Sequence, residues 1–299
     1  MELTNEFKQE VRSELLKQRK NYSGSDSAFA KQYGINASIF SRLQKGETER
    51  VLSEGQWLNV GRLLDVTVNR RKWNAAKTEV FSAIEEDVLF CKNESKGRIF
   101  VDDCGIGKTF TAKYLSKTLK NCFYIDASQA KTKNRFIKLL ARTIGIDSDG
   151  RIEDIKDNIK YYIRLIPTPV IIVDEAGDLQ YDAFLELKGI WNGTENACGW
   201  YLMGADGLRA KIERGISNKK VGYRELFSRL SDKYSNIVPP DRSAKMAFYR
   251  KLITDVLSAN SEQGKNISAI VDKCLVQVDG NISGLRRAES LLILSSYNG

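Results

Sequence analysis

Residues 101–115 have the sequence "VDDCGIGKTFTAKYL". It fits the phosphate-binding pattern G-x-x-x-x-G-K-[ST] at every fixed position except the first, where Asp102 replaces glycine. A mostly apolar run, residues 98–101, precedes it and a helical stretch, residues 110–119, follows. A strand, a glycine-rich loop and a helix in this order predict a loop whose backbone N–H groups surround phosphates.

Asp102 does not rule out a working loop. The first glycine of the pattern mainly eases the turn, whereas Gly105 and Gly107 let the backbone close around the phosphates. Aspartate tolerates turn conformations and hydrogen-bonds its own backbone. The carboxylates of Asp102 and Asp103 add negative charge near a polyphosphate, so we expect them to weaken its binding somewhat.

A second motif lies about 65 residues further on, in "PTPVIIVDEAGD", residues 167–178. The apolar run 170–173 predicts a central parallel strand, and Asp174 and Glu175 follow it, where open α/β sheets bind ligands. Asp174 and Thr109 suit Mg²⁺, and Glu175 suits polarisation of an attacking water. A strand at 122–125 and a helix at 134–144 fit between the motifs. Together they predict a bound nucleotide with Mg²⁺, and its hydrolysis.

Composition excludes several other classes of protein. The 299 residues include no histidine, which removes Ser-His-Asp and Cys-His catalysis and histidine-bound metals. Five cysteines without a C-x-x-C pair make zinc or a disulfide framework unlikely, and we expect a cytoplasmic location. No apolar stretch is long enough to span a membrane. The net charge of +9 favours a polyanionic partner, nucleic acid before membrane.

Residues 1–66 form a separate predicted unit. The stretch "SDSAFAKQYGINASIFSRLQKGE", residues 25–47, predicts a helix, a tight turn at Gly34 and a second helix. It resembles the helix-turn-helix of Cro-type phage repressors, and "LSEGQWLNVGRLLDV", residues 52–66, resembles their later helices. The expected core of this later part is Trp57, Leu58, Val60, Leu63 and Leu64.

The second helix of this unit carries the candidate DNA contacts. Its exposed side chains suit phosphates and base edges, and we predict that duplex DNA is bound by Ser38, Ser41, Arg42 and Lys45. A helix-turn-helix kept only as a protein-docking module is the alternative.

The rest of the chain fits one larger α/β fold. Residues 67–97 predict a linker and a leading helix, 199–204 a fourth strand, 223–241 a helix and a short fifth strand, and 241–299 three helical stretches. This order resembles the AAA+ ATPases, and within them the group of the bacteriophage Mu B transposition protein, transposon ATPases and IstB-type helpers. We therefore expect a parallel-sheet P-loop core at 98–240 and a helical lid at 241–299.

The resemblance implies roles for matching residues. Lys108 would bridge the terminal phosphates, within a cradle formed by Asp103, Cys104, Gly105, Ile106, Gly107, Lys108, Thr109 and Phe110. The segment "FSRL" implies that Arg229, with Arg224 in reserve, completes a neighbouring subunit's site; the alternative is a surface arginine in an ion pair.

Two departures from the family pattern suggest slow turnover, with ATP serving more as an assembly switch. Ala205 occupies the usual sensor position, leaving Asp206 as a substitute. The family's lid motif usually reads G-[DN]-x-R, but here Ser283 follows Gly280-Asn281-Ile282 in place of the arginine. Arg286, one turn later, would reach the γ-phosphate instead.

The resemblance also implies partners. A basic run after the second strand, Lys131, Lys133 and Arg135, is a second candidate for DNA contact; the cluster at 208–220 is another, and either could be a solvated face. The leading hypothesis is an ATPase that self-assembles on duplex DNA, as a ring or filament, and delivers target DNA to a transposase. The alternatives are a helicase loader or replication initiator, and a repressor-like regulator that senses nucleotide.

Overall fold

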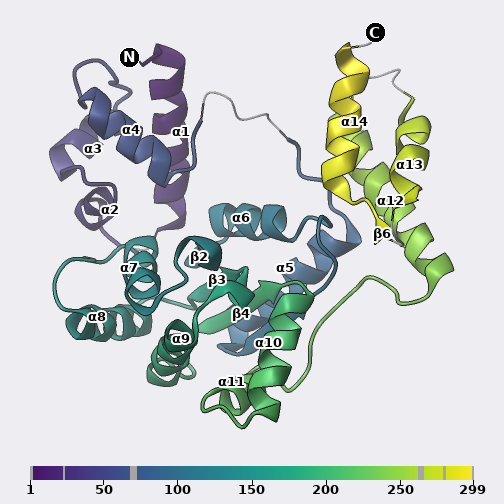
Figure 1. Cartoon of the computed structure of the whole chain (residues 1–299). Coiled ribbons are helices and arrows are strands. Elements are labelled where there is room, and N and C mark those ends of the chain that lie inside the picture. The colour runs from purple at the N-terminus through teal and green to yellow at the C-terminus, as the bar shows by residue number, and fades with distance from the viewer. Residues whose placement is uncertain (1–2, 23, 68–72, 262–265, 279–280, 298–299) are drawn as a thin grey trace.

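The structure is a computed structural model that describes residues 3–22, 24–67, 73–261, 266–278 and 281–297. Four parallel strands form its central sheet, in the order β1 (Gly97–Val101), β4 (Gly199–Gly204), β3 (Val170–Asp174) and β2 (Cys122–Asp126). Every residue of β3 is buried, as expected of an apolar strand covered on both faces. The predicted α/β fold is confirmed (Figure 1).

Side chains alternate between the two faces of the sheet, and each face has its own core. Ile99, Ile171 and Leu202 contribute to one core, which is covered by α7 (Lys133–Ile144), α8 (Ile152–Leu165), α9 (Tyr181–Gly193), α10 (Asp206–Ser217) and α11 (Tyr223–Arg229). Phe100 and Ile172 contribute to the other, which is covered by α5 (Glu79–Glu94) and α6 (Lys108–Thr118). The result is a three-layer arrangement.

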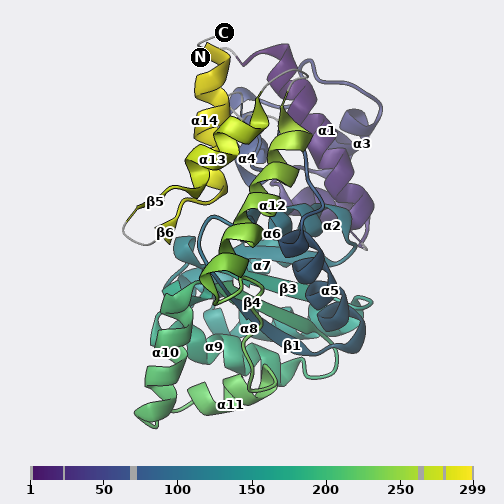
Figure 2. The same cartoon turned by 90° about the vertical axis from the view of Figure 1, so that its right-hand side faces the viewer.

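The C-terminal helices, here called the lid, are α12 (Arg242–Asn260), α13 (Ile267–Leu275) and α14 (Leu285–Tyr297) (Figure 2). A two-stranded ribbon, β5 (Gln277–Val278) and β6 (Asn281–Ile282), joins the last two. Buried lid residues such as Tyr249 and Leu252 belong to the same core as Phe100 and Ile172. The lid therefore shares its hydrophobic core with one face of the sheet.

The prediction of a short fifth strand near the end of residues 223–241 is wrong. The segment contributes an isolated parallel bridge between Ser235 and Phe100 at the outer edge of β1. Ser235 exchanges hydrogen bonds with Ile99 and Val101, at 2.8 and 2.9 Å. Beyond Ser235 the chain turns to the phosphate loop, and Pro239 and Pro240 lack the N–H that a longer ladder needs.

The N-terminal unit, formed by the described residues up to 66, has a separate core. It contains α1 (Asn5–Asn21), α2 (Asp26–Gln32), α3 (Ala37–Gln44) and α4 (Glu54–Leu63). Gly34 has a φ of 67°, which allows the tight turn between α2 and α3. Arg12 of α1 donates to the carbonyl of Leu43 at 2.6 Å and so holds the end of α3. The predicted helix, turn and helix is present.

Two residues expected in this core lie outside it. Leu58 is 51% exposed and Leu63 is 38% exposed. Trp57, Val60 and Leu64 form the inward face of α4, and Leu58 is rotated about 100° from Trp57 around the helix. Leu63 instead lines a cavity between the N-terminal unit and the sheet domain.

The five cysteines are all free, and four of them are buried. Among the described residues, no helix has the length and apolar character needed to cross a membrane.

Candidate nucleotide site

The phosphate loop runs from the end of β1 to the start of α6. Gly105 and Gly107 have φ values of 74° and 103°, which favour glycine and turn the backbone N–H groups into one concavity. Helix α6 begins after Gly107 with no side-chain cap, so N–H donors of its first turn are left for a ligand. Lys108 Nζ donates to the carbonyls of Asp102 and Asp103 at 2.7 and 2.6 Å. The loop has the form that binds phosphates.

The predicted magnesium residues meet beside this loop. Thr109 Oγ1 donates to Asp174 Oδ2 at 2.6 Å, and Tyr124 donates its phenol proton to the same oxygen at 3.1 Å. Within the described residues, no group of three acidic or cysteine side chains could hold a metal alone. Mg²⁺ commonly binds one or two protein oxygens together with substrate phosphates, and the Thr109 hydroxyl and the Asp174 carboxylate offer two such oxygens side by side.

Charges in the site affect one another's protonation. Burial lowers the pKa of Lys108, although nearby carboxylates, including those of Asp102 and Asp174, favour its charged form. Burial and then the charge of Asp174 raise the pKa of Glu175, while Lys108 lowers it. Glu175 is exposed, and its backbone adopts the left-handed conformation with φ 50°. Glu175 is one of the residues that line the pocket at the phosphate loop.

Asp102, which replaces the pattern's glycine, is 8% exposed and holds three backbone donors. Its Oδ1 accepts from the N–H of Asp103 at 2.8 Å, and its Oδ2 accepts from Ile237 and Val238 at 2.6 and 3.0 Å. The expected hydrogen bond to the local backbone is present. Its two further hydrogen bonds join the phosphate loop to the segment that leads into the lid. The sequence did not predict this connection.

Asp103 faces the lid rather than the pocket. Its carboxylate accepts from Lys245 at 2.6 Å and from the Tyr249 hydroxyl at 2.9 Å. Burial raises the pKa of Asp103, but these hydrogen bonds outweigh burial and bring it below its ordinary value. Asp103 therefore does not line the cavity where we predicted a cradle residue.

A pocket of about 330 Å³ lies at the loop, within the range typical of small-ligand sites. It is lined by nine of the predicted residues, namely Cys104, Gly105, Ile106, Gly107, Lys108, Thr109, Phe110, Glu175 and, from the lid, Arg286. Its remaining lining residues were not predicted: Trp73, Asn74, Ala76, Thr78, Phe81, Thr111, Ala205, Val256, Leu285 and Glu289. The aromatic Trp73 and Phe81 precede β1 and give one wall the character of a base site.

Comparisons with known proteins agree with this geometry. Residues 101–212 match a family model described as an AAA domain. This segment is similar to AAA-type P-loop domains, and the sheet with the helices that cover it is called the AAA domain below. The structure of the Aeropyrum pernix Orc1 protein in complex with DNA is similar, with a TM-score of 0.54 and 14% sequence identity. The similarity covers 76% of this chain and 61% of that chain, so this chain spans under two thirds of its length. A search of curated proteins gave no match.

Asp206 and Arg286, the residues predicted to replace the usual sensors, differ in their position relative to the pocket. Asp206 is exposed at the start of α10, and it is the preceding Ala205 that lines the pocket. Arg286 lies at the pocket, in the first turn of α14. Gly280 of the lid motif lies outside the described residues.

Arg229 is remote from the phosphate loop of its own AAA domain. Its carbonyl lies beside Gly97, at the opposite end of β1 from the loop. Its guanidinium donates to the carbonyl of Glu225 at 3.4 Å, and its buried Nε has no hydrogen-bond partner within the part of the chain that the structure describes. Arg224, the reserve candidate, pairs with Asp232 at 3.2 Å.

The candidate DNA residues also differ in their surroundings. Ser38, Ser41 and Arg42 are exposed on α3, Lys45 is exposed at its C-terminal cap, and Arg42 pairs with Glu47 at 2.7 Å. In the basic run after β2, Lys131 pairs with Asp178 at 2.6 Å and Lys133 with Glu186 at 2.9 Å. Arg135 is exposed and lines the cavity beside the N-terminal unit.

Proposed function

We propose that this protein is an ATP- and Mg²⁺-dependent ATPase that binds duplex DNA. The observation that carries the proposal is the meeting of Lys108, Thr109 and Asp174 at one end of the sheet, with Thr109 and Asp174 in contact at 2.6 Å. Lys108 would contact the terminal phosphates, Thr109 and Asp174 would hold Mg²⁺, and Glu175 would orient the attacking water. Burial in the pocket strengthens these electrostatic contacts.

Exposed α3 supports the DNA-binding part of the proposal. It follows a tight turn, and its polar and basic side chains lie at the surface, as a recognition helix requires. The run after β2 is a weaker candidate, because Lys131 and Lys133 would first have to leave their ion pairs. We therefore assign the main DNA contact to α3 and a secondary one to Arg135.

We further propose that the protein assembles on DNA and delivers target DNA to a transposase. The motif order and the helix-turn-helix ahead of the ATPase support this, together with Arg229, which lies far from its own phosphate loop. A replication initiator or helicase loader is the second candidate, favoured by the similarity to Orc1 over 76% of this chain. Stimulation of DNA strand transfer by a transposase, measured beside helicase loading, separates the two.

The ATPase assignment is tested with Lys108→Ala and Glu175→Gln. Lys108→Ala should abolish ATP binding, because it removes the charge between the phosphates. Glu175→Gln should keep ATP binding and lower the hydrolysis rate at least ~100-fold, leaving the DNA-bound oligomer trapped. Glu195→Gln changes an exposed carboxylate after α9 in the same way and should hydrolyse normally. Normal turnover by Glu175→Gln would show that another residue positions the water.

A further inference from the structure

Helix α6 contacts the candidate nucleotide site at one end and the N-terminal unit at the other. Two of its lysines, one turn apart, pair with carboxylates of that unit: Lys113 with Asp65 at 3.5 Å and Lys117 with Glu14 at 2.8 Å. The Asn21 side chain also donates to the carbonyl of Lys117. Helix α6 therefore begins at the phosphate loop and contacts the N-terminal unit through its C-terminal half.

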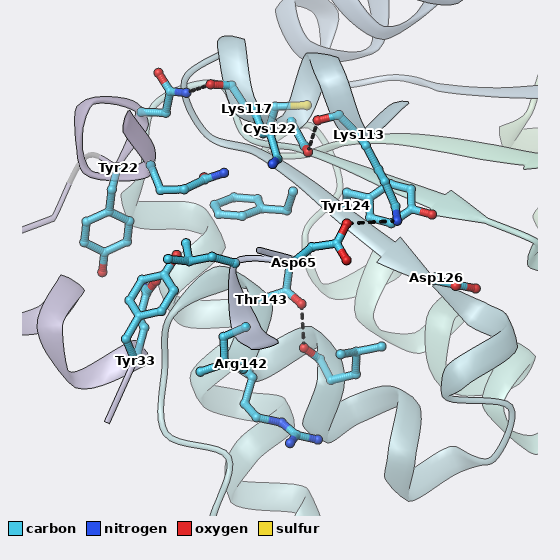
Figure 3. A pocket seen from close by; sticks show the side chains of 18 of the residues that line it. Tyr22, Tyr33, Asp65, Lys113, Lys117, Cys122, Tyr124, Asp126, Arg142 and Thr143 are labelled. Atoms are coloured by element: carbon cyan, nitrogen blue, oxygen red, sulfur yellow. Dashed lines mark hydrogen bonds and ion pairs between the residues drawn. The ribbon is translucent and has the colours of Figure 1, made fainter. Parts of the chain in front are cut away.

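A second set of contacts reaches the same place from the magnesium side. Thr109 and Tyr124 donate to one oxygen, Asp174 Oδ2. The Lys113 ammonium lies 5.6 Å from the centre of the Tyr124 ring, so it contacts Tyr124 on one side and Asp65 on the other (Figure 3). Burial and the charge of Asp174 raise the pKa of Tyr124, which keeps the phenol protonated as a donor.

The surface between the N-terminal unit and the AAA domain is loosely filled. A cavity of about 650 Å³ lies there, lined by side chains of both parts, among them Tyr22, Tyr33 and Tyr124. Tyr162 is the partly buried apolar side chain of the AAA domain that packs against the N-terminal core, and its hydroxyl donates to Tyr22 at 3.0 Å. Polar contacts between parts with separate cores let the parts move as bodies.

We propose that Tyr124 and Lys113 couple the magnesium carboxylate, Asp174, to the N-terminal unit, so that bound Mg²⁺-nucleotide loosens the hold of α6 on that unit. The proposal rests on the proposed function, because it requires Mg²⁺-nucleotide at Thr109 and Asp174. Thr109 and Asp174 would hold Mg²⁺, and in doing so they would give up the hydrogen bond that joins them here. Tyr124, which donates to the same Asp174 oxygen, would then be held less firmly, and so would the ring against which Lys113 lies.

The sign of the coupling follows from the contacts. The hydrogen-bonded trio of Thr109, Asp174 and Tyr124 coexists with Lys113 paired to Asp65. A ligand that breaks the trio favours the state in which Lys113 and Lys117 release their carboxylates. An N-terminal unit that is held less tightly can adjust α3 to duplex DNA while the AAA domain engages the same DNA. Mg²⁺-nucleotide should therefore tighten DNA binding, and DNA should tighten nucleotide binding by the same factor.

The test measures the affinity of the full chain for a fluorescent duplex, with and without Mg²⁺ and a non-hydrolysable ATP analogue. The unmodified protein should bind DNA about fivefold or more tightly with the analogue. The variant Asp65→Asn with Glu14→Gln, which cuts the ion pairs to α6, should bind tightly in both conditions. Tyr124→Phe, which loses the hydrogen bond that links Asp174 to the ring beside Lys113, should bind DNA with the same affinity in both conditions.

Asp147→Asn is the matched control. It removes another ion pair between the two parts, Lys31 with Asp147 at 3.6 Å, which does not involve α6. This variant should respond to the analogue as the unmodified protein does. The coupling is overturned if the Asp65 and Glu14 variant keeps the full response, or if Asp147→Asn loses it equally. Failure of the unmodified protein to bind Mg²⁺-nucleotide overturns the proposed function as well, whereas binding of both ligands without mutual effect overturns the coupling alone.

Discussion

One buried carboxylate fixes the phosphate loop to a segment more than 130 residues later in the chain. Asp102 accepts hydrogen bonds from Ile237 and Val238, while its other oxygen holds the N–H of Asp103. A glycine at this position could accept none of these through a side chain. The departure from the phosphate-binding pattern therefore has a structural reason, because the charge is spread over three N–H donors rather than directed at the ligand.

At the residue scale, we predict that Asp102→Gly makes the loop fit its pattern better and the protein less stable. Three backbone N–H groups lose their charged acceptor, and the free energy of unfolding should fall by about 2–4 kcal/mol. Urea unfolding monitored by tryptophan fluorescence measures this change. Asp206→Asn, at an exposed carboxylate, serves as the control. An unchanged or raised stability for Asp102→Gly would mean that the three hydrogen bonds contribute nothing.

At the element scale, the lid is joined to the phosphate loop by direct backbone contact. The N–H of Leu285, at the start of α14, donates to the carbonyl of Gly105 at 2.8 Å. A Cβ at Gly284 would lie 2.6 Å from that carbonyl oxygen, closer than atoms can approach. Gly284 thus permits the close approach of α14 that brings Arg286 to the pocket.

We predict that Gly284→Ala displaces the start of α14 from the loop. Overpacking of this kind costs about 1–3 kcal/mol, so nucleotide binding should weaken by roughly 5- to 150-fold if nucleotide binds only when the lid is docked. Calorimetric titration with a non-hydrolysable ATP analogue gives the affinity. Gly207→Ala is the control, because a Cβ at Gly207 in α10 meets no atom within 4 Å. Equal nucleotide affinities of the two variants would show that docking of the lid does not contribute to nucleotide binding.

The sequence predicted the elements of the core better than the contacts among them. Residues 170–173 and 105–109 have patterns that few structures other than a buried strand and a phosphate loop satisfy. Apolar spacing around Phe81 indicated a buried helix face but not that Trp73 and Phe81 also line the pocket. Periodicity shows which side of a helix is buried, not which partner buries it. For the same reason, it could not show that Asp103 contacts the lid.

At the scale of the whole molecule, we predict that ATP sites are completed between subunits. Arg229→Ala should keep nucleotide binding yet lose DNA-stimulated hydrolysis, because the charge on the transferring phosphate lacks its arginine. In a mixture with Lys108→Ala protein, about a quarter of randomly formed interfaces join an intact Lys108 to an intact Arg229. Hydrolysis measured in the mixture should therefore partly recover. Two folded variants that co-assemble without any recovery would exclude a role for Arg229 in the neighbouring site.

We also predict that removal of residues 1–66 weakens DNA binding and flattens its dependence on salt. The exposed basic residues Arg42 and Lys45 of α3 would no longer displace counterions from the phosphates. Binding isotherms at several salt concentrations give the slope. The remaining chain should stay folded, because the N-terminal core is separate from both cores of the sheet. A slope equal to that of the full chain would favour the protein-docking alternative for this unit.

The separate core of the N-terminal unit also bears on how such a protein diversifies. A foreign DNA-reading head grafted before residue 73 should fold independently and bring its own sequence preference. It would nevertheless ignore nucleotide unless it also presented acidic side chains to Lys113 and Lys117, as Asp65 and Glu14 do here. If α3 binds DNA as we propose, DNA preference and the response to nucleotide would depend on different surfaces. Exchange of the N-terminal unit would then change the first in one step, while the second would have to be regained residue by residue.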